Sequence, residues 1–157
     1  MGMRKVALIT DGWRRLFTYA WPAGILQRIR ETGEDVNLYI FNSTGNWSRD
    51  AGYNRAEYNI YNLPELSDFD GIILELNNIS SPAVLADVIS NAKRSGRPVV
   101  SIANELGDFY YVGIDNYSAM KQVIAHLHEV HDCKKFWLLV GAQDNYESSC
   151  RLQGMLD

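Results

Sequence analysis

The sequence predicts an α/β fold in which a parallel β-sheet lies between two layers of helices. Short apolar runs alternate with longer helical segments, and near-continuous apolar runs are typical of strands that are covered on both faces. No hairpin turn signal joins one run to the next, so each connection has to cross over and leave successive strands parallel. The runs that we expect to be strands are KVALIT (5–10), VNLYIF (36–41), GIILEL (71–76), PVVSIA (98–103) and KFWLLVG (135–141).

The first two helices are expected between the first three strands. The first should begin near Thr18 or Tyr19, with Pro22 in its opening turn, where proline is tolerated, and should end at Gly33. The second covers about 52–63 and is polar and rich in tyrosine.

Two further helices have clearer start signals. Ser80 or Ser81 is expected to cap the third helix, with Pro82 at its first position and Gly96 at its end. A fourth helix follows the Asp-Asn pair at 115–116 and carries apolar residues at helical spacing.

The composition is that of an ordinary, mildly acidic globular chain. Its 157 residues suffice for one hydrophobic core, and 46% of them are hydrophobic, 22% are charged and the net charge is -4. This charge disfavours a nucleic-acid-binding surface, so we expect no nucleic-acid contact here. The chain passes from Met3, Arg4 and Lys5 into its first strand without a signal-peptide core, and it holds no apolar run of membrane length. We therefore expect a cytoplasmic protein with no membrane contact.

Candidate binding residues follow the predicted strands, because ligands of parallel α/β sheets bind beyond the carboxyl ends of the strands. These positions are rich in amides and hydroxyls and are flanked by aromatic side chains, which suits a polyhydroxylated or heterocyclic small molecule. The residues that we single out on this ground are Asp11, Trp13, Phe17, Tyr19, Asn42, Asn77, Asn104 and Ser148.

Other functions of α/β proteins fit the sequence less well. TDGWRR has one glycine where a phosphate-binding loop has several. A phosphoacceptor receiver domain needs clustered carboxylates, an aspartate after the third strand and a late lysine, and only Asp11 and Glu75 are in place. No serine lies in a G-x-S-x-G motif, and Cys133 and Cys150 have neither a partnered histidine nor the spacing of metal ligands. We expect no enzymatic activity, no cofactor and no metal site.

Seven short motifs occur in order between Lys5 and Gly154. They are VALITD, GILQRIRETG, FDGIIL, RPVVSIAN, VGIDN, CKKFWLLVG and SSCRLQG. In this order they resemble the ligand-binding domain of the LacI/GalR repressors and the related type I periplasmic-binding-protein fold. The resemblance implies two flavodoxin-like lobes, joined by three crossovers, that close on a sugar, nucleoside or similar metabolite.

The resemblance also implies where the lobes divide. Residues 3–114 correspond to the N-terminal lobe, and residues 115–157 correspond to a crossover and the first part of the C-terminal lobe. A complete domain of this family is longer, so we expect the chain to be a truncated form of it. Because an incomplete second lobe would leave Trp137, Leu138 and Leu139 uncovered, we expect self-association, and a homodimer is expected for the family.

Two further ligand-binding candidates come from the resemblance. Arg151 matches the family arginine that holds ligand hydroxyls or carboxylates with its planar fork. Asp115 matches the family's Asp-Asn turn, although capping of the following helix is the favoured explanation for it. Ser148 is expected to cap the last helix. Asn104 replaces an aspartate that many members carry, which leaves the ligand unidentified.

The output domain stays open at this point. Repressors of the family carry a helix-turn-helix before this domain, whereas here Met3 precedes the first strand almost directly. If Met3 is the native first residue, the chain resembles the sensors of xylose-type regulators, or those of GGDEF diguanylate cyclases and histidine kinases; DFYYVGIDNYSAM favours this second group. If Met3 is not the native first residue, the chain fits a LacI-type repressor. A dimerisation module with a degenerate pocket is the alternative function.

Overall fold

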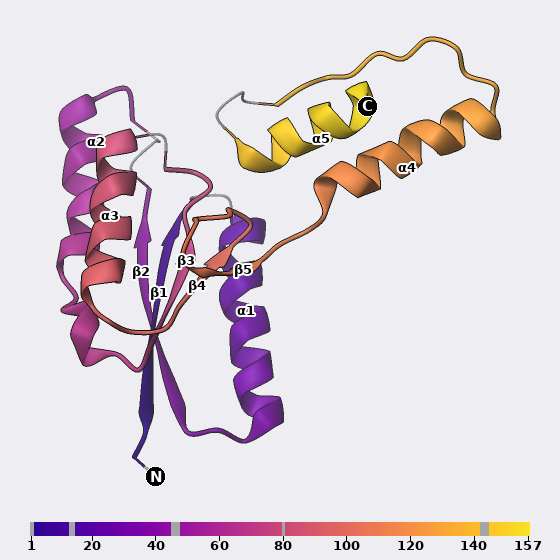
Figure 1. The fold of residues 1–157 in the computed structure, drawn as a ribbon. Helices are drawn as coiled ribbons and strands as arrows, with labels where there is room; N and C mark the ends of the chain where they lie inside the picture. Colours follow the sequence, from indigo (N-terminus) through magenta and orange to yellow (C-terminus); the bar gives the residue numbers. More distant parts are fainter. Residues whose placement is uncertain (1, 13–14, 45–47, 80, 142–144) are drawn as a thin grey trace.

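The computed structural model describes residues 2–12, 15–44, 48–79, 81–141 and 145–157, with only the backbone for residues 15–18. It contains a sheet of five parallel strands with helices on both faces, followed by a pair of helices (Figure 1). This confirms the predicted fold class. The strands are β1 (Arg4–Asp11), β2 (Val36–Ser43), β3 (Gly71–Glu75), β4 (Val99–Ile102) and β5 (Tyr110–Val112), in the spatial order β2-β1-β3-β4-β5.

The main hydrophobic core lies on the sheet face that α2 (Ala51–Glu57) and α3 (Pro82–Arg94) cover, while α1 (Arg15–Thr32) lies on the other face (Figure 1). Alternate residues of neighbouring strands point into this core because side chains alternate between the two faces of a sheet. The fully enclosed positions come from the central strands, and each such side chain contributes roughly 1.5–3 kcal/mol by leaving water. Core residues from β1 and β3 include Ala7, Ile9, Ile72 and Leu74.

Helix α1 begins three residues earlier than predicted. It starts at Arg15, so Pro22 lies inside the helix, and the prediction that Pro22 falls in the opening turn is wrong. The helix continues through Pro22 although proline donates no backbone hydrogen bond. Gly33, with a φ of 65°, ends the helix as predicted.

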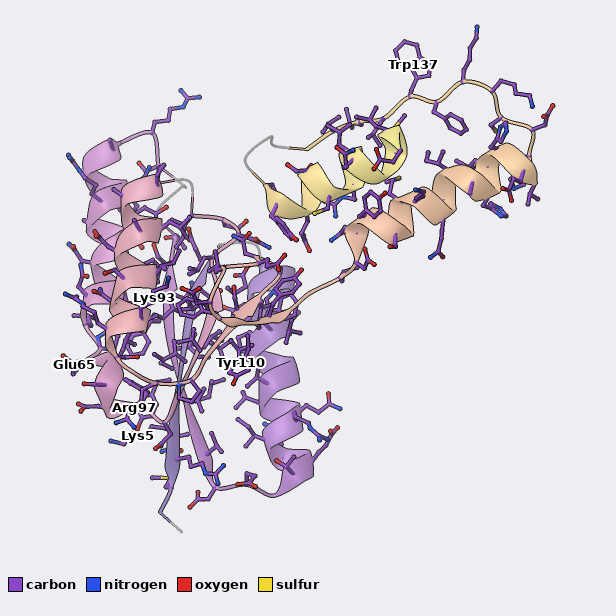
Figure 2. The ribbon with its side chains drawn as sticks, in the orientation of Figure 1. Lys5, Glu65, Lys93, Arg97, Tyr110 and Trp137 are labelled. Carbon is purple, nitrogen blue, oxygen red and sulfur yellow. The ribbon has the colours of Figure 1, made fainter. Side chains whose placement is uncertain are left out.

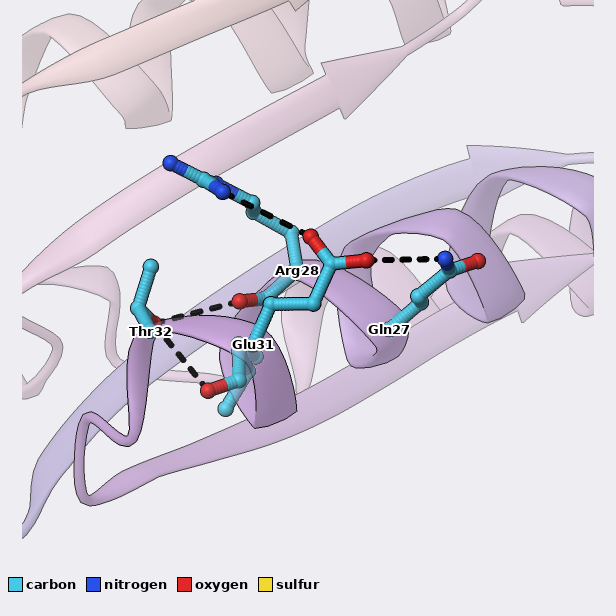
Figure 3. A network of polar contacts seen from close by, with 5 residues as sticks. Gln27, Arg28, Glu31 and Thr32 are labelled. Atoms are coloured by element: carbon cyan, nitrogen blue, oxygen red, sulfur yellow. Dashed lines mark hydrogen bonds and ion pairs between the residues drawn. The ribbon is translucent and has the colours of Figure 1, made fainter.

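A polar network holds the exposed last turns of α1 (Figure 3). Gln27 Nε2 donates to Glu31 Oε1 at 2.8 Å, and Arg28 pairs with the other Glu31 oxygen at 3.5 Å. Thr32 Oγ1 donates to the carbonyl oxygen of Arg28 at 3.1 Å. Such pairs three and four residues apart stabilise an exposed helix by roughly 0.2–0.5 kcal/mol each.

The end signals of α3 are confirmed. The backbone N–H of Val84 donates to Ser81 Oγ, Pro82 occupies the first turn, and Gly96 takes a left-handed φ of 66° after the helix. The second predicted helix is divided, because the α-helical turns of α2 stop at Glu57 and a 3-10 helix, η1 (Tyr58–Asn62), continues from it.

The strand predicted at 135–141 is wrong. This segment is extended but has no strand assignment, and the described part of the chain places no other strand beside it to complete a hydrogen-bonded ladder. The edge strand β5 was not predicted, because its three residues are exposed and too few to show a pattern. It is held by pairing with β4, where Ser101 lies opposite Tyr111.

The extended segment leaves two large side chains almost fully exposed. Trp137 is 98% exposed and points away from the helix pair (Figure 2), and Leu139 is 99% exposed. Among the described residues, none of the helices is long and apolar enough to span a membrane.

Replacing both Trp137 and Leu139 by serine is expected to lower self-association of the 157-residue chain. Exposed apolar surface of this kind drives association because its burial removes it from water. Sedimentation equilibrium would measure the change, with Leu63→Ser, another exposed leucine, as the control. A parent chain that is monomeric at all concentrations tested would contradict the expectation.

Candidate functional site

Polar side chains of three adjacent strands lie side by side at the carboxyl end of the sheet. Asn42 of β2, Thr10 of β1 and Glu75 of β3 share one register row. Thr10 Oγ1 donates a hydrogen bond of 2.8 Å to Glu75 Oε2, and both residues are buried. Asp11 and Ser43 form the next row of β1 and β2, so five polar residues end these strands.

Asp11 is the most unusual member of this group. Its side chain is buried, with 3% of the residue exposed, and the Tyr58 hydroxyl hydrogen-bonds to its carboxyl. The second carboxyl oxygen, Oδ2, has no hydrogen-bond partner. Burial, helped by the charge of nearby Glu75, raises the pKa of Asp11 to about 7.

Glu75 is buried in the same region, with 6% of the residue exposed. Burial raises its pKa above the ordinary value, and the hydrogen bond from Thr10 opposes that rise. Burial and the charge of Asp11 likewise raise the pKa of Tyr58 to about 12 and that of Tyr61 further, so both hydroxyls stay protonated and available as donors. The Tyr61 hydroxyl donates to the Thr10 carbonyl at 2.9 Å.

Two asparagine side chains donate hydrogen bonds to backbone carbonyls at Asp11 and the residue after it. Asn78 Nδ2 donates to the Asp11 carbonyl at 2.7 Å, and Asn42 Nδ2 donates to the carbonyl of Gly12 at 3.4 Å. Asn42 Oδ1 is buried and has no partner. Two acceptors are therefore unpartnered, Asp11 Oδ2 and Asn42 Oδ1, and they belong to adjacent rows of β1 and β2, whose side chains point to opposite faces of the sheet.

Helix α5 (Tyr146–Leu156) approaches the sheet at this end (Figure 1). The Tyr146 hydroxyl donates to Glu105 Oε2 at 3.0 Å, and the Tyr146 ring meets the Tyr111 ring edge-on at 6.5 Å. The charge of Glu147 also contributes to the raised pKa of Glu75. The first turn of α5 is thus within electrostatic reach of the carboxyl end of β3.

Ser148 does not cap α5 as predicted. Asn145 is the capping residue, with its Oδ1 accepting the Ser148 backbone N–H at 2.9 Å. Ser148 is buried, and its Oγ accepts the backbone N–H of Gly141 at 3.0 Å. Because the Asn145 side chain already accepts the backbone N–H of Ser148 at the start of the helix, the Ser148 hydroxyl is free to bind the segment that precedes the helix.

Arg151 reaches the start of the other helix of the pair, α4 (Asn116–Glu129). Its Nη1 donates to Asn116 Oδ1 at 2.7 Å. Asp115 caps α4 by accepting the Ser118 backbone N–H at 2.9 Å, and this hydrogen bond lowers the Asp115 pKa. The capping role of Asp115 is confirmed, while ligand contacts by Asp115 and Arg151 stay predictions.

The remaining predicted site residues are spread out. Tyr19 is exposed on α1, and Asn77 and Asn104 are half-buried in the loops after β3 and β4. The Asn104 carbonyl accepts the Ser101 hydroxyl at 2.6 Å. Trp13 and the side chain of Phe17 lie outside the described residues. The structure adds residues that were not among the candidates, namely Thr10, Tyr58, Tyr61, Glu75 and Asn78, and only the strand register could have indicated Thr10 and Glu75.

Arg151→Ala is expected to destabilise the α4–α5 pair by about 1–3 kcal/mol, because it leaves the buried amide of Asn116 without its charged partner. Urea unfolding followed by circular dichroism would measure this. Arg151→Lys keeps the charge but not the planar fork and should recover only part of the loss. Unchanged stability in Arg151→Ala would show that this hydrogen bond contributes nothing.

One hollow of the described structure lies away from the candidate site. A hollow of about 470 Å³ lies near the amino ends of the strands and is bordered by Pro64, Glu65, Ser67, Asn91 and Arg94. None of the predicted site residues borders it. We base the candidate site on the buried polar groups at the carboxyl end of the sheet and on their unpartnered acceptors. Within the described part of the chain, no three histidine, cysteine or acidic residues are grouped to hold a metal ion.

Comparison with known proteins assigns the fold. No protein-family model matches the sequence, and no curated protein sequence matches it. Among solved structures, the chain is similar to an ABC transporter solute-binding protein of Actinobacillus succinogenes with bound D-allose, at a TM-score of 0.70 and 16% identity over 98% of this chain and 54% of that one. It is also similar to GanP, a glucose-galactose-binding protein of Geobacillus stearothermophilus, at a TM-score of 0.68 and 20% identity, covering 99% and 53% of the two chains.

A transcription regulator has the same fold. For CcpA of Lactococcus lactis the TM-score is 0.67 with 19% identity, covering 99% of this chain and 52% of that one. The chain therefore has the fold of the type I periplasmic-binding-protein-like domains, which confirms the resemblance seen in its motifs. It spans about half the length of the solved structures that it matches.

Proposed function

We propose that this chain is part of a sensing domain that binds a small polar molecule, such as a sugar or nucleoside, and controls an output domain by lobe closure. The observation that carries the proposal is the pair of buried, unpartnered acceptors, Asp11 Oδ2 and Asn42 Oδ1, at the carboxyl end of the sheet. Ligands of open α/β sheets bind at this end, and buried polar atoms are normally hydrogen-bonded. The fold supports the proposal, since solved structures with it include sugar-binding proteins and transcription regulators.

Lobe closure requires two bodies that a ligand can bridge. We propose that residues 3–114 form the first lobe and that residues 115–157 contain a crossover and the start of the second. A ligand can shift this equilibrium only by its higher affinity for the closed state. Tyr146 supports a bridging role for α5, because its hydroxyl donates a hydrogen bond to Glu105 of the first lobe.

The biological form that we propose is a cytoplasmic regulator, either a LacI-type transcription factor or a signalling protein with a GGDEF or kinase output. In this form the chain binds an effector without catalysing a reaction, contacts neither nucleic acid nor membrane itself, and works as a homodimer. The unpaired thiols of Cys133 and Cys150 are compatible with a reducing compartment. Fractionation of cells that express the full-length protein tests the location.

One observation favours a second candidate function, a dimerisation module whose pocket is degenerate. Trp137 and Leu139 are almost fully exposed, as expected for residues that another surface covers. In this case the domain would assemble the protein without responding to a small molecule.

A thermal-shift screen of sugars, nucleosides and amino acids on the full-length protein separates the two candidates. A sensor is stabilised by its ligand in proportion to the logarithm of the ligand concentration above Kd. No stabilisation by any compound, with a persistent dimer, would favour the dimerisation module. The 157-residue chain alone is expected to bind weakly or not at all; micromolar binding that Arg151→Ala abolishes would contradict this expectation.

A further inference from the structure

Two histidine rings meet at the end of α4 that is remote from the sheet (Figure 1). His126 lies in the last turn of the helix and His131 follows the helix, and their Nε2 atoms are 3.2 Å apart. The spacing in sequence does not indicate this contact, because side chains that meet on a helix are three or four residues apart, not five. A turn brings the rings together: Asp132 has a left-handed φ of 53°, and the Cys133 backbone N–H donates to the Leu127 carbonyl at 3.1 Å.

The two rings are placed as two ligands of one metal ion would be. Imidazole nitrogens that bind one tetrahedral zinc ion at about 2.0–2.1 Å lie about 3.3 Å apart, whereas a square-planar ion would bring them to about 2.9 Å. The observed 3.2 Å is closer to the tetrahedral value. Rings that share such an ion have centroids about 5.0–5.3 Å apart, and those of a straight N–H···N hydrogen bond about 5.5 Å. The observed centroids are 5.0 Å apart, so the rings are tilted toward each other and a hydrogen bond between them is bent.

A metal ion satisfies both nitrogens of this contact, whereas a hydrogen bond satisfies them in one arrangement of hydrogens only. In a neutral imidazole one ring nitrogen carries a hydrogen and the other is an acceptor, so the hydrogen bond needs one Nε2–H and one bare Nε2. When both Nε2 atoms are bare, two lone pairs face each other, and a divalent ion accepts both. The two acidic and two basic side chains at 129–135 balance, and Lys134 is paired with Asp132, so the local charge does not repel a cation.

We propose that His126 and His131 bind one zinc ion through their Nε2 atoms, with water in the remaining positions, and that the ion ties the turn after α4 to the helix. Imidazole is a common zinc ligand, and both residues are exposed, so an ion can reach them from solvent. Among the described residues, no third histidine, cysteine or acidic side chain is grouped with them. His128 is outside the site, because it lies two positions from His126 and its Nδ1 donates to the Cys133 carbonyl at 3.2 Å.

The test is isothermal titration calorimetry of the 157-residue chain, without a polyhistidine tag, with zinc chloride near neutral pH. We expect one zinc ion to bind per chain. His126→Gln and His131→Gln should each weaken zinc binding at least about tenfold, since even the loss of an outer partner of a zinc ligand costs ~10-fold in affinity. His128→Gln, the matched control at the same helix end, should change the zinc affinity less than about twofold, and so should Cys133→Ser, because neither removes a ligand.

Other outcomes count against the proposal. Zinc affinity that is unchanged in His126→Gln or His131→Gln overturns this pair as the site, and so does a loss in His128→Gln as large as theirs. A parent chain that binds no zinc overturns the site altogether.

NMR of the imidazole nitrogens gives a second readout. Zinc should shift the Nε2 signals of His126 and His131 and leave those of His128 in place, because only the first two rings share the ion. Shifts at Nδ1 of the pair, or at His128 alone, overturn the proposed geometry. Since this measurement uses the parent chain, it decides the question even if a variant fails to fold, which circular dichroism would detect.

Discussion

Asp11→Asn is expected to stabilise the folded chain, and to do so most at alkaline pH. Folding raises the Asp11 pKa from its ordinary value near 4 to about 7, because the ionised carboxylate is buried. The contribution of Asp11 to stability is therefore fully present below pH 4 and is lost as pH rises through 7. With about 1.4 kcal/mol for each pKa unit, the loss reaches about 4 kcal/mol at pH 8. The amide of asparagine cannot ionise, so the variant avoids this loss.

Urea unfolding at pH 5 and pH 8, followed by tryptophan fluorescence, measures this effect. The advantage of Asp11→Asn over the parent chain should grow by about 2–3 kcal/mol between the two pH values. Asp87→Asn removes an exposed carboxylate and should show no such growth. A variant that is equally or less stable than the parent at both pH values would mean that Asp11 is not held in a strained, charged state. A residue that destabilises its own fold is typical of functional sites, which fits the proposed role of Asp11 in binding.

Gly154→Ala is expected to separate helices α4 and α5. A Cβ atom at Gly154 would lie 2.3 Å from the backbone oxygen of Tyr117 in α4, and 3.1 Å from the carbonyl carbon of that residue. Both are backbone atoms, so no side-chain rotation relieves the clash and the helices have to move apart. Overpacking of this kind costs about 1–3 kcal/mol, which outweighs the higher helix propensity of alanine.

The same substitution at Gly24 provides the matched control. Gly24 lies inside α1, and a Cβ atom there meets nothing within 4 Å. Gly24→Ala should therefore stabilise the chain by roughly 0.5–1 kcal/mol through helix propensity alone. Opposite signs for the two variants in urea unfolding would confirm the close packing of α4 on α5. Equal stabilisation by both would show that the helices do not approach this closely in solution.

Most of the sheet could be predicted because its signals are local. Four of the five predicted apolar runs form strands, with ends that differ by only a few residues, because a short apolar run rich in β-branched residues favours an extended strand. The ends of α3 followed from Ser81, Pro82 and Gly96, whose conformational preferences act within one turn. The start of α1 was missed because Pro22 argues locally against a helix that the chain nevertheless forms.

The candidate site could be predicted only in part. The rule that loops after parallel strands bind ligands pointed to Asp11 and Asn42, and both carry an unpartnered buried acceptor. It could not indicate Thr10 and Glu75, which lie inside strands and meet only because β1 and β3 pair in one register. The motif that pointed to Arg151 could not show that its guanidinium bonds to Asn116, a partner 35 residues away.

The sequence by itself determined the fold class, the order of the first four strands and the helices between them, and the end of the sheet at which to look for a site. These follow from periodicity, helix capping and the handedness of crossovers, which act through neighbouring residues. Only the tertiary structure decided that residues 135–141 form no strand, because a strand exists only beside a partner. It also decided that Asp11 is buried beside Glu75 with one oxygen free, because burial and charge depend on what other segments bring to the same place.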